Sequence, residues 1–255
     1  MKLRSSRVLS ITALAVITFC ATAFTGCQPE NKKDVSYLAL GDSLAAGQTP
    51  YSTHDKGYPD FIAEKIKANG YDLTYHNLGI SGINTSDMIE GLEQDYKGVN
   101  ELIAEADLIT IDIGGNDLIN RIKRSRGFIE YDRQEVDGAV KKAGANLESI
   151  IKMIKKQKPD VVICVIGYYA QLPPRGQEIS DLIKALNDSL QKAATTNGAV
   201  FIAIDQVISQ NVTDYLPNPD DEHLSIAGYK AVADEVWKSM EYLFPKDNQA
   251  IHPKT

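Results

Sequence analysis

His223 is the best candidate for a general base in this sequence. It stands at the end of the run Asp220-Asp221-Glu222-His223. A base that activates a hydroxyl nucleophile needs a carboxylate to orient its ring. We expect Asp220 to turn back to the imidazole, because Asp221 is too close along the chain to reach the ring easily and Glu222 should point away. The other histidines lie in a polar loop, a strand and a polar tail, at His54, His76 and His252.

Two serines compete for the role of nucleophile. Ser43 follows an apolar run that reads as a strand, and it precedes the sequence LAAG at 44–47. Capping a helix would explain Ser43 equally well, since serine is a common N-cap. Ser81 lies in the run GISGI at 79–83, which falls short of G-x-S-x-G because Ile83 occupies the last glycine position. The residues alone leave both serines open.

Acyl transfer also needs hydrogen-bond donors aimed at the developing oxyanion. Gly82 offers a backbone N–H with no side chain in the way, and Asn116 offers a side-chain amide. The glycines before Asn116 would let the chain turn tightly at a strand end, which by itself also explains the sequence GGND at 114–117. We therefore take Gly82 and Asn116 as candidate oxyanion donors.

The elements that must position these residues alternate along the chain. Short apolar runs predict strands at 37–40, 73–78, 108–113, 161–166 and 199–204. Helical periodicity predicts helices at 58–69, 85–94, 136–156, 178–195 and 226–243, while 118–133 reads as irregular. Alternation of this kind indicates parallel crossover units and one α/β sheet covered on both faces. Ligands of such sheets bind beyond the carboxyl ends of the strands, where three of the polar clusters stand.

Four blocks together resemble those of the SGNH, or GDSL, hydrolases, in the family's order and across roughly residues 36–243. They are the sequences GDSL at 41–44, SG at 81–82, GGND at 114–117 and DxxH at 220–223. The resemblance implies a three-layer α/β/α sandwich with a parallel five-stranded sheet, the flavodoxin-like fold of that family. It also implies a serine esterase or lipase that uses no metal and no other cofactor.

The resemblance further assigns roles to the candidate residues. Ser43 becomes the nucleophile, and its own backbone N–H joins Gly82 and Asn116 in the oxyanion hole. His223 becomes the base and Asp220 its orienting carboxylate, while Ser81 serves only to position the backbone. The chain departs from the family in having Leu224-Ser225 after the histidine, where many members have proline.

The substrate class is left open by the sequence. We expect cleavage of carboxylic esters of lipids, lysophospholipids or short acyl chains, with segments 118–133 and 167–176 walling the site. Removal of O-acetyl groups from a cell-wall or other polysaccharide is an alternative. A non-catalytic surface lipoprotein that binds glycans or lipids is an alternative of another class, but the Ser43, Asp220 and His223 set argues against it. The sequence contains no phosphate-loop or dinucleotide-binding motif.

Charge limits the partners further. The 255 residues carry 27 basic and 34 acidic side chains, and residues 1–26 hold three of the basic ones and no acid. An acidic body of this kind is repelled by a phosphate backbone, so we expect no nucleic-acid partner. We expect a monomer acting on a small-molecule, lipid or glycan ester.

The N-terminus predicts export and a lipid anchor. Lys2, Arg4 and Arg7 precede a long uncharged apolar stretch, which is typical of a secretory signal. The stretch ends in AFTGC at 23–27, which is similar to a bacterial lipobox, so we expect lipidation of Cys27 and anchoring to the extracytoplasmic face of the cell membrane. An uncleaved single-span anchor is the alternative.

The domain boundaries follow from that reading. We expect a signal peptide at 1–26, a tether at 27–35, the hydrolase domain at 36–245 and a polar tail at 246–255. Cys20 would be lost with the signal, and Cys164 sits in a buried-strand pattern. The three cysteines allow no disulfide framework and no cysteine-based metal site.

Overall fold

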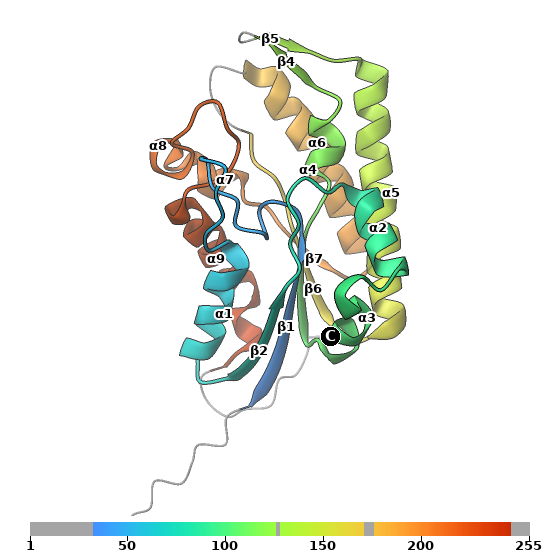
Figure 1. Cartoon of the computed structure of the whole chain (residues 1–255), viewed down its shortest axis with the longest axis vertical. Helices are drawn as coiled ribbons and strands as arrows, with labels where there is room; N and C mark the ends of the chain where they lie inside the picture. Colours follow the sequence, from blue (N-terminus) through green and yellow to red (C-terminus); the bar gives the residue numbers. More distant parts are fainter. Residues whose placement is uncertain (1–32, 126–127, 171–175, 246–255) are drawn as a thin grey trace, which may run out of the picture. The chain divides into compact units, whose positions relative to one another are not determined.

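A five-stranded parallel sheet forms the centre of the protein in a computed structural model that describes residues 33–125, 128–170 and 176–245 (Figure 1). The strand order is β2-β1-β3-β6-β7. Every pairing between neighbours in this sheet is parallel. The strands are β1 (Asp34–Gly41), β2 (Asp72–Asn77), β3 (Leu108–Asp112), β6 (Val162–Ile166) and β7 (Val200–Ile202). The carboxyl ends of β1 and β3 therefore lie side by side.

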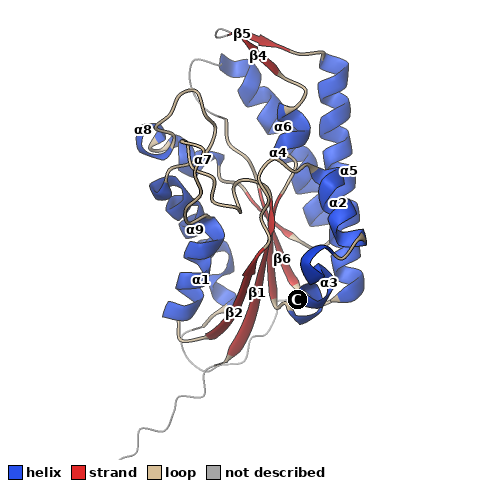
Figure 2. Cartoon of the chain, viewed as in Figure 1, coloured by secondary structure: helices blue, strands red, loops and turns tan. Residues whose placement is uncertain are grey.

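Helices cover both faces of the sheet, as Figure 2 shows. On one face α1 (Tyr58–Ala68) packs against α9 (Ile226–Met240). On the other face the long helix α5 (Arg133–Gln157) packs against α2 (Thr85–Glu93) and α6 (Gly176–Thr196). The expected three-layer α/β/α sandwich is confirmed. The shorter helices are η1 (Tyr96–Gly98), α3 (Val99–Glu105), α4 (Gly115–Ile119), α7 (Asp205–Ser209), α8 (Val212–Tyr215) and η2 (Glu241–Leu243).

Burial of the strands follows their place in the sheet. All five residues of the central strand β3, the sequence LITID, are buried. A parallel strand covered on both faces needs a nearly continuous apolar run, and β3 has one except for Thr110 and Asp112. The hydroxyls of Thr110 and Tyr37 satisfy each other at 2.8 Å. That leaves Asp112 as a buried ionisable group at the end of β3.

Side-chain caps start three of the helices. Asn84 Oδ1 accepts the backbone N–H of Ser86 at 2.8 Å at the start of α2. Asp132 does the same for Gln134 at 2.7 Å at the start of α5. Ser225 Oγ accepts the N–H of Gly228 at 3.2 Å at the start of α9. These caps satisfy backbone donors that the first helical turn leaves without partners.

The segment 118–133, expected to be irregular, contains regular structure. Helix α4 occupies its start, and β4 (Lys123–Ser125) pairs antiparallel with β5 (Phe128–Glu130). Strands of three residues are too short to show an alternating pattern, which is why periodicity missed them. The sheet also starts earlier than expected, because β1 pairs with β2 from Asp34, inside the predicted tether.

The N-terminal predictions fall outside the described residues. The proposed signal peptide, most of the tether with Cys27, and the tail 246–255 all belong to that undescribed part. Within the ranges that are described, no helix is both long and apolar enough to cross a bilayer. Cys164 is buried in β6 as predicted, and burial raises the pKa of its thiol to about 12. A thiol of that kind is inert packing.

Removing a core side chain from α5 tests this packing. Leu147 is 0% exposed, and Leu147→Ala should lower the free energy of unfolding by about 2–5 kcal/mol because it leaves a cavity. Lys152→Ala, on the exposed face of the same helix, removes only an ion pair with Glu148 and should change it by less than about 1 kcal/mol. Denaturant unfolding of the two variants measures both values, and equal losses would contradict the packing described.

Candidate active site

Ser43 lies in a tight turn directly after β1. The backbone N–H of Ala46 donates to Asp42 O at 3.1 Å, and that of Gln48 donates to Ser43 O at 3.0 Å. The chain beyond β2 packs closely on this turn, because a Cβ on Gly79 would come within 2.4 Å of Ala46 N. Only glycine fits there. The turn thus fixes Ser43 at the carboxyl end of the first strand.

A cavity of about 150 Å³ at this edge brings four of the predicted residues together. Ser43, Gly82, Asn116 and His223 all line it, although they come from three separate loops and the start of α4. The apolar part of its wall comes from the loops and helices around them, through Leu44, Ile119, Tyr168, Tyr169 and Ile183. Sequence reasoning expected Tyr168 and Tyr169 to wall the site, and that expectation is confirmed.

The carboxylate that meets the His223 ring is Asp221, and this corrects the expectation that Asp220 does so. Asp221 Oδ1 lies 2.7 Å from His223 Nδ1, and the His223 side chain is only 11% exposed. Asp220 is an exposed residue whose backbone N–H donates to Asn218 Oδ1 at 3.1 Å. The sequence-based objection that Asp221 is too near to reach the ring is therefore wrong.

A local turn explains how so close a neighbour reaches the ring. Asp221 Oδ1 also accepts the backbone N–H of His223 at 2.8 Å, which is the turn that aspartate makes with the residue two positions on. One carboxylate oxygen thus holds both the main chain and the ring of His223. The loop is fixed further by Tyr169, whose hydroxyl donates to Glu222 O at 2.6 Å, and by buried Leu224.

The two candidate oxyanion donors are held by the segment that follows β2. Gly82 has a φ of +85°, in the region that favours glycine. The Asn116 amide donates to Ile83 O at 2.9 Å, one residue after Gly82. A side-chain amide nitrogen carries two hydrogens, so this bond fixes the amide while a second N–H remains to be donated to a ligand.

Asp117, the next residue, fixes the position of α4 and therefore of the Asn116 amide. Its carboxylate accepts the backbone N–H of Thr85 at 2.9 Å and the Thr85 hydroxyl at 2.7 Å. The Asn146 amide on α5 donates in turn to the Thr85 hydroxyl at 2.8 Å. The last two residues of the GGND block therefore have different tasks, since Asn116 faces the cavity and Asp117 ties α4 to α2.

Ser81 stands apart from the catalytic candidates. Its hydroxyl lies 3.1 Å from Nε2 of His54, which belongs to an exposed loop. The sequence did not single out His54, because nothing in a polar loop signals a partner 27 residues away. The bond ties the loop after the Ser43 turn to the segment that carries Gly82.

Two carboxyl groups are buried behind Ser43. Asp42 is 2% exposed and accepts a hydrogen bond from the Tyr168 hydroxyl at 2.7 Å. Asp112 is 0% exposed and accepts one from the Tyr58 hydroxyl at 2.6 Å. Burial raises the pKa of Asp42, and burial together with the neighbouring Asp42 raises the pKa of Asp112 well above its usual range. The sequence analysis missed Asp112, which resembles an ordinary strand-end residue.

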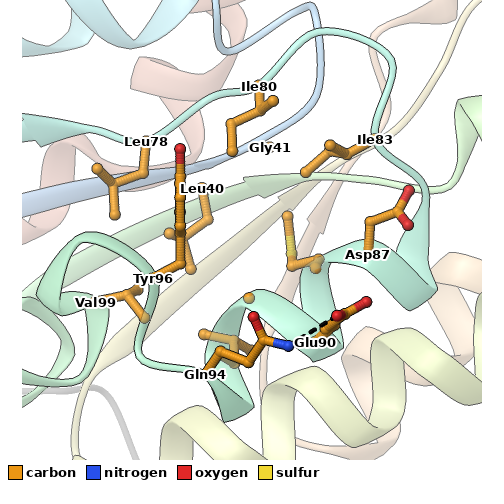
Figure 3. A pocket seen from close by; sticks show the side chains of 13 residues that line it. Leu40, Gly41, Leu78, Ile80, Ile83, Asp87, Glu90, Gln94, Tyr96 and Val99 are labelled. Atoms are coloured by element: carbon orange, nitrogen blue, oxygen red, sulfur yellow. Dashed lines mark hydrogen bonds between the residues drawn. The ribbon is translucent and has the colours of Figure 1, made fainter.

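A second and more apolar cavity of about 230 Å³ adjoins the segment that holds Gly82, and Figure 3 shows the side chains that line it. Ile80 and Ile83, which flank Ser81 and Gly82, line it together with Gly41 of β1. The rest of its wall comes from the end of β2, from α2 and from the chain that follows, including Leu78, Met88, Gly91, Leu92, Tyr96 and Val99. In the described part of the chain, no group of three or more His, Cys, Asp or Glu side chains is arranged to hold a metal ion.

The fold and this edge of the sheet define a class: a three-layer α/β/α sandwich with a serine after the first strand and a histidine before the last helix. Comparison with known proteins agrees with that class. The chain belongs to the GDSL-like lipase/acylhydrolase family, whose sequence model matches residues 39–231. It is accordingly a carboxylic ester hydrolase.

The chain is similar in sequence to a curated protein and in fold to several solved structures. The uncharacterized protein YpmR of Bacillus subtilis is 23% identical over 254 residues, covering 94% of this chain and 97% of that protein. The lipase Lip_vut3 from a goat rumen metagenome superposes with a TM-score of 0.67 at 20% identity, covering 80% of this chain and 97% of its own. Axe2, an acetylxylan esterase of Geobacillus stearothermophilus, gives 0.62 at 16% identity, covering 86% and 99%.

Proposed function

We propose that the protein hydrolyses acyl esters with Ser43 as the nucleophile, His223 as the base and Asp221 as the carboxylate that orients the histidine. The observation that carries the proposal is the single cavity lined by Ser43, Gly82, Asn116 and His223. Asp221 accepts the proton on Nδ1, which leaves Nε2 of the same ring as the acceptor that a general base requires.

The steps follow from this placement. Ser43 Oγ attacks the acyl carbonyl carbon while His223 Nε2 takes the hydroxyl proton. The negative oxygen accepts hydrogen bonds from the backbone N–H groups of Ser43 and Gly82 and from the Asn116 amide. His223 then gives its proton to the leaving alcohol, and the ester to Ser43 remains. A water molecule that gives a proton to His223 attacks this ester, the acid leaves, and Ser43 recovers its proton.

The apolar cavity beside the site favours substrates whose acyl chains are longer than acetyl. The catalytic cavity of about 150 Å³ has room for a small acyl group, and the neighbouring cavity of about 230 Å³ is apolar. The two adjoin one segment, and Gly41 of the second cavity is two residues from Ser43. We therefore propose that the second cavity receives the end of the acyl chain of the substrate.

Replacing the two serines tests the nucleophile. Ser43→Ala should lower kcat by roughly 10⁴–10⁶-fold, as removal of a nucleophilic serine does. Ser81→Ala should cost far less, because Ser81 bonds His54 and not His223. The measurement is steady-state hydrolysis of p-nitrophenyl esters by both variants. An inactive Ser81→Ala beside an active Ser43→Ala would overturn the assignment.

A wild-type chain that cleaves no ester but binds a glycan would favour the non-catalytic alternative.

The two adjacent aspartates offer a matched pair for the orienting role. Asp221→Asn should lower kcat by up to about 10⁴-fold, because an amide there no longer holds the required tautomer of His223. Asp220→Asn changes an exposed neighbour and should leave kcat close to that of the wild type. Both are measured on the same ester near neutral pH. A larger loss in Asp220→Asn would restore the sequence-based assignment.

Filling the apolar cavity tests the chain-length proposal. A Cβ on Gly91 meets no atom closer than 3.9 Å, so Gly91→Leu should fold and occupy the cavity. Excluding about three methylenes at ~0.8 kcal/mol each should lower kcat/KM for an octanoate ester by about 10- to 100-fold, with little effect on the acetate ester. Gly138→Leu, at an equally open helical glycine of α5, is the control. Parallel losses on both esters would refute this use of the cavity.

We also propose, from the lipobox-like sequence alone, that Cys27 carries the lipid that anchors the protein to the membrane. Cys27→Ser should release the protein from the membrane fraction or leave an unprocessed precursor. Mass spectrometry of the wild-type N-terminus should show a diacylglyceryl group on Cys27, because two or more acyl chains are needed for stable anchoring. Met1 still attached beside an unmodified Cys27 would instead support a retained membrane helix.

A further inference from the structure

The two carboxyl groups behind Ser43 lie at the carboxyl ends of neighbouring strands, with Asp42 directly after β1 and Asp112 as the last residue of β3. Gly41, the residue before Asp42, pairs with Asp112 across β1 and β3. Asp112 Oδ2 accepts the backbone N–H of Asp42 at 3.1 Å, the neighbouring Asp42 raises the pKa of Asp112, and both carboxyl groups are almost wholly buried. Two buried carboxylates that are close together cannot both be ionised, because the negative charge on one raises the pKa of the other strongly. One proton must therefore lie between them.

The same two carboxyl groups accept hydrogen bonds from the backbone on both sides of Ser43. Asp112 Oδ2 accepts the N–H groups of Asp42 at 3.1 Å and Ala45 at 3.2 Å. Asp42 Oδ1 accepts the N–H of Leu44 at 3.1 Å. Three of the backbone donors around Ser43 thus end on the two carboxyl groups, so the position of the serine depends on them.

Glycine at position 41 makes room for this arrangement. A Cβ there would come within 2.2 Å of Asp112 Oδ1, nearer than any real contact. Glycine is therefore needed at position 41 to leave space for the Asp112 carboxyl, and not to form a turn. A strand residue with any side chain would push the carboxyl out from beneath the Ser43 turn.

We propose that Asp42 and Asp112 are positioning residues that share one proton and together hold Ser43 in its reactive place. The proposal rests on the function proposed above for Ser43. Asp42 also lines the catalytic cavity, but the role proposed for the pair is exerted through the backbone of the turn.

The surroundings of the pair keep the proton in place. The ionisable groups that face it are five phenols and one imidazole, from β1, α1, the chain after β6, the loop before α9, and α9: Tyr37, Tyr58, Tyr168, Tyr169, His223 and Tyr229. Burial raises the pKa of each of these phenols, so all of them are neutral near pH 7. The phenols therefore add no negative charge beside the pair near pH 7.

A bound proton of this kind makes stability depend on pH with a defined sign. The unfolded chain loses both carboxyl protons at about pH 4, whereas burial raises the pH at which the folded pair loses its last proton. Between those values the folded state binds one proton more, so its stability falls as the pH rises. Asp112→Asn keeps a donor to Asp42 but cannot titrate, and the Tyr58 hydroxyl can rotate to accept from the new amide.

The experiment compares unfolding equilibria of the wild type and Asp112→Asn between about pH 5 and pH 7. The ratio of the wild-type unfolding constant to that of the variant should rise about tenfold per pH unit, because one proton is linked to folding. Asp137→Asn, at an exposed aspartate on α5, should give a ratio that does not change with pH. A flat ratio for Asp112→Asn would show that Asp112 is ionised in the folded chain and would overturn the proposal.

Kinetics test the positioning role separately. Asp112→Ala removes the acceptor of the Ala45 N–H and the second acceptor of the Asp42 N–H, which keeps its 3.0 Å bond to Asp112 O. The change should lower kcat about 10²-fold with little change in KM, as a misplaced reacting group does. Asp112→Asn should stay within about tenfold of the wild type. A wild-type kcat in Asp112→Ala would overturn the role. If Asp112→Ala does not fold, the pH series and the kcat of Asp112→Asn still test the proposal. Failure of the proposed nucleophile would appear instead as activity that survives in Ser43→Ala.

Discussion

The contact between Gly41 and the Asp112 carboxyl is the constraint on which the site depends. Parallel pairing of β1 with β3 sets these residues opposite each other, and only a glycine leaves space for the carboxyl. The carboxyl then collects the N–H groups of Asp42 and Ala45, which fixes the turn that presents Ser43. The sheet register thus acts on the turn that holds Ser43 through two hydrogen bonds to one buried side chain.

Sequence patterns predicted the layers of this fold well and the fine geometry of the site less well. Buried strands and amphipathic helices have periodicities that the chain displays directly, as in the all-buried LITID of β3. The hairpin of β4 and β5 has too few residues for such a pattern. The sequence analysis rejected Asp221 as the partner of His223 because two residues so close along an extended chain could not meet. In the structure the loop turns back, and the His223 backbone N–H donates to the Asp221 carboxylate.

Buried partners are the other features that spacing cannot show. The Asp42 side chain meets Tyr168, 126 residues later, and Ser81 meets His54 across a distance of 27 residues. Both contacts arise because the carboxyl ends of parallel strands gather loops from distant parts of the chain at one edge. The sequence could place Ser43, Gly82, Asn116 and His223 at that edge, but the groups that orient them depend on the packing between loops.

The segment from Ile80 to Ile83 links the chemistry to the choice of substrate. Its glycine faces the catalytic cavity, while its two isoleucines line the apolar one. Ile83 O also fixes the Asn116 amide, so an acyl chain that pressed on Ile83 would act on an oxyanion donor as well as gain apolar contact. Binding energy from a remote part of a substrate can raise kcat when it improves alignment at the reacting atoms. A chain-length effect in this protein should therefore appear in kcat as well as in KM.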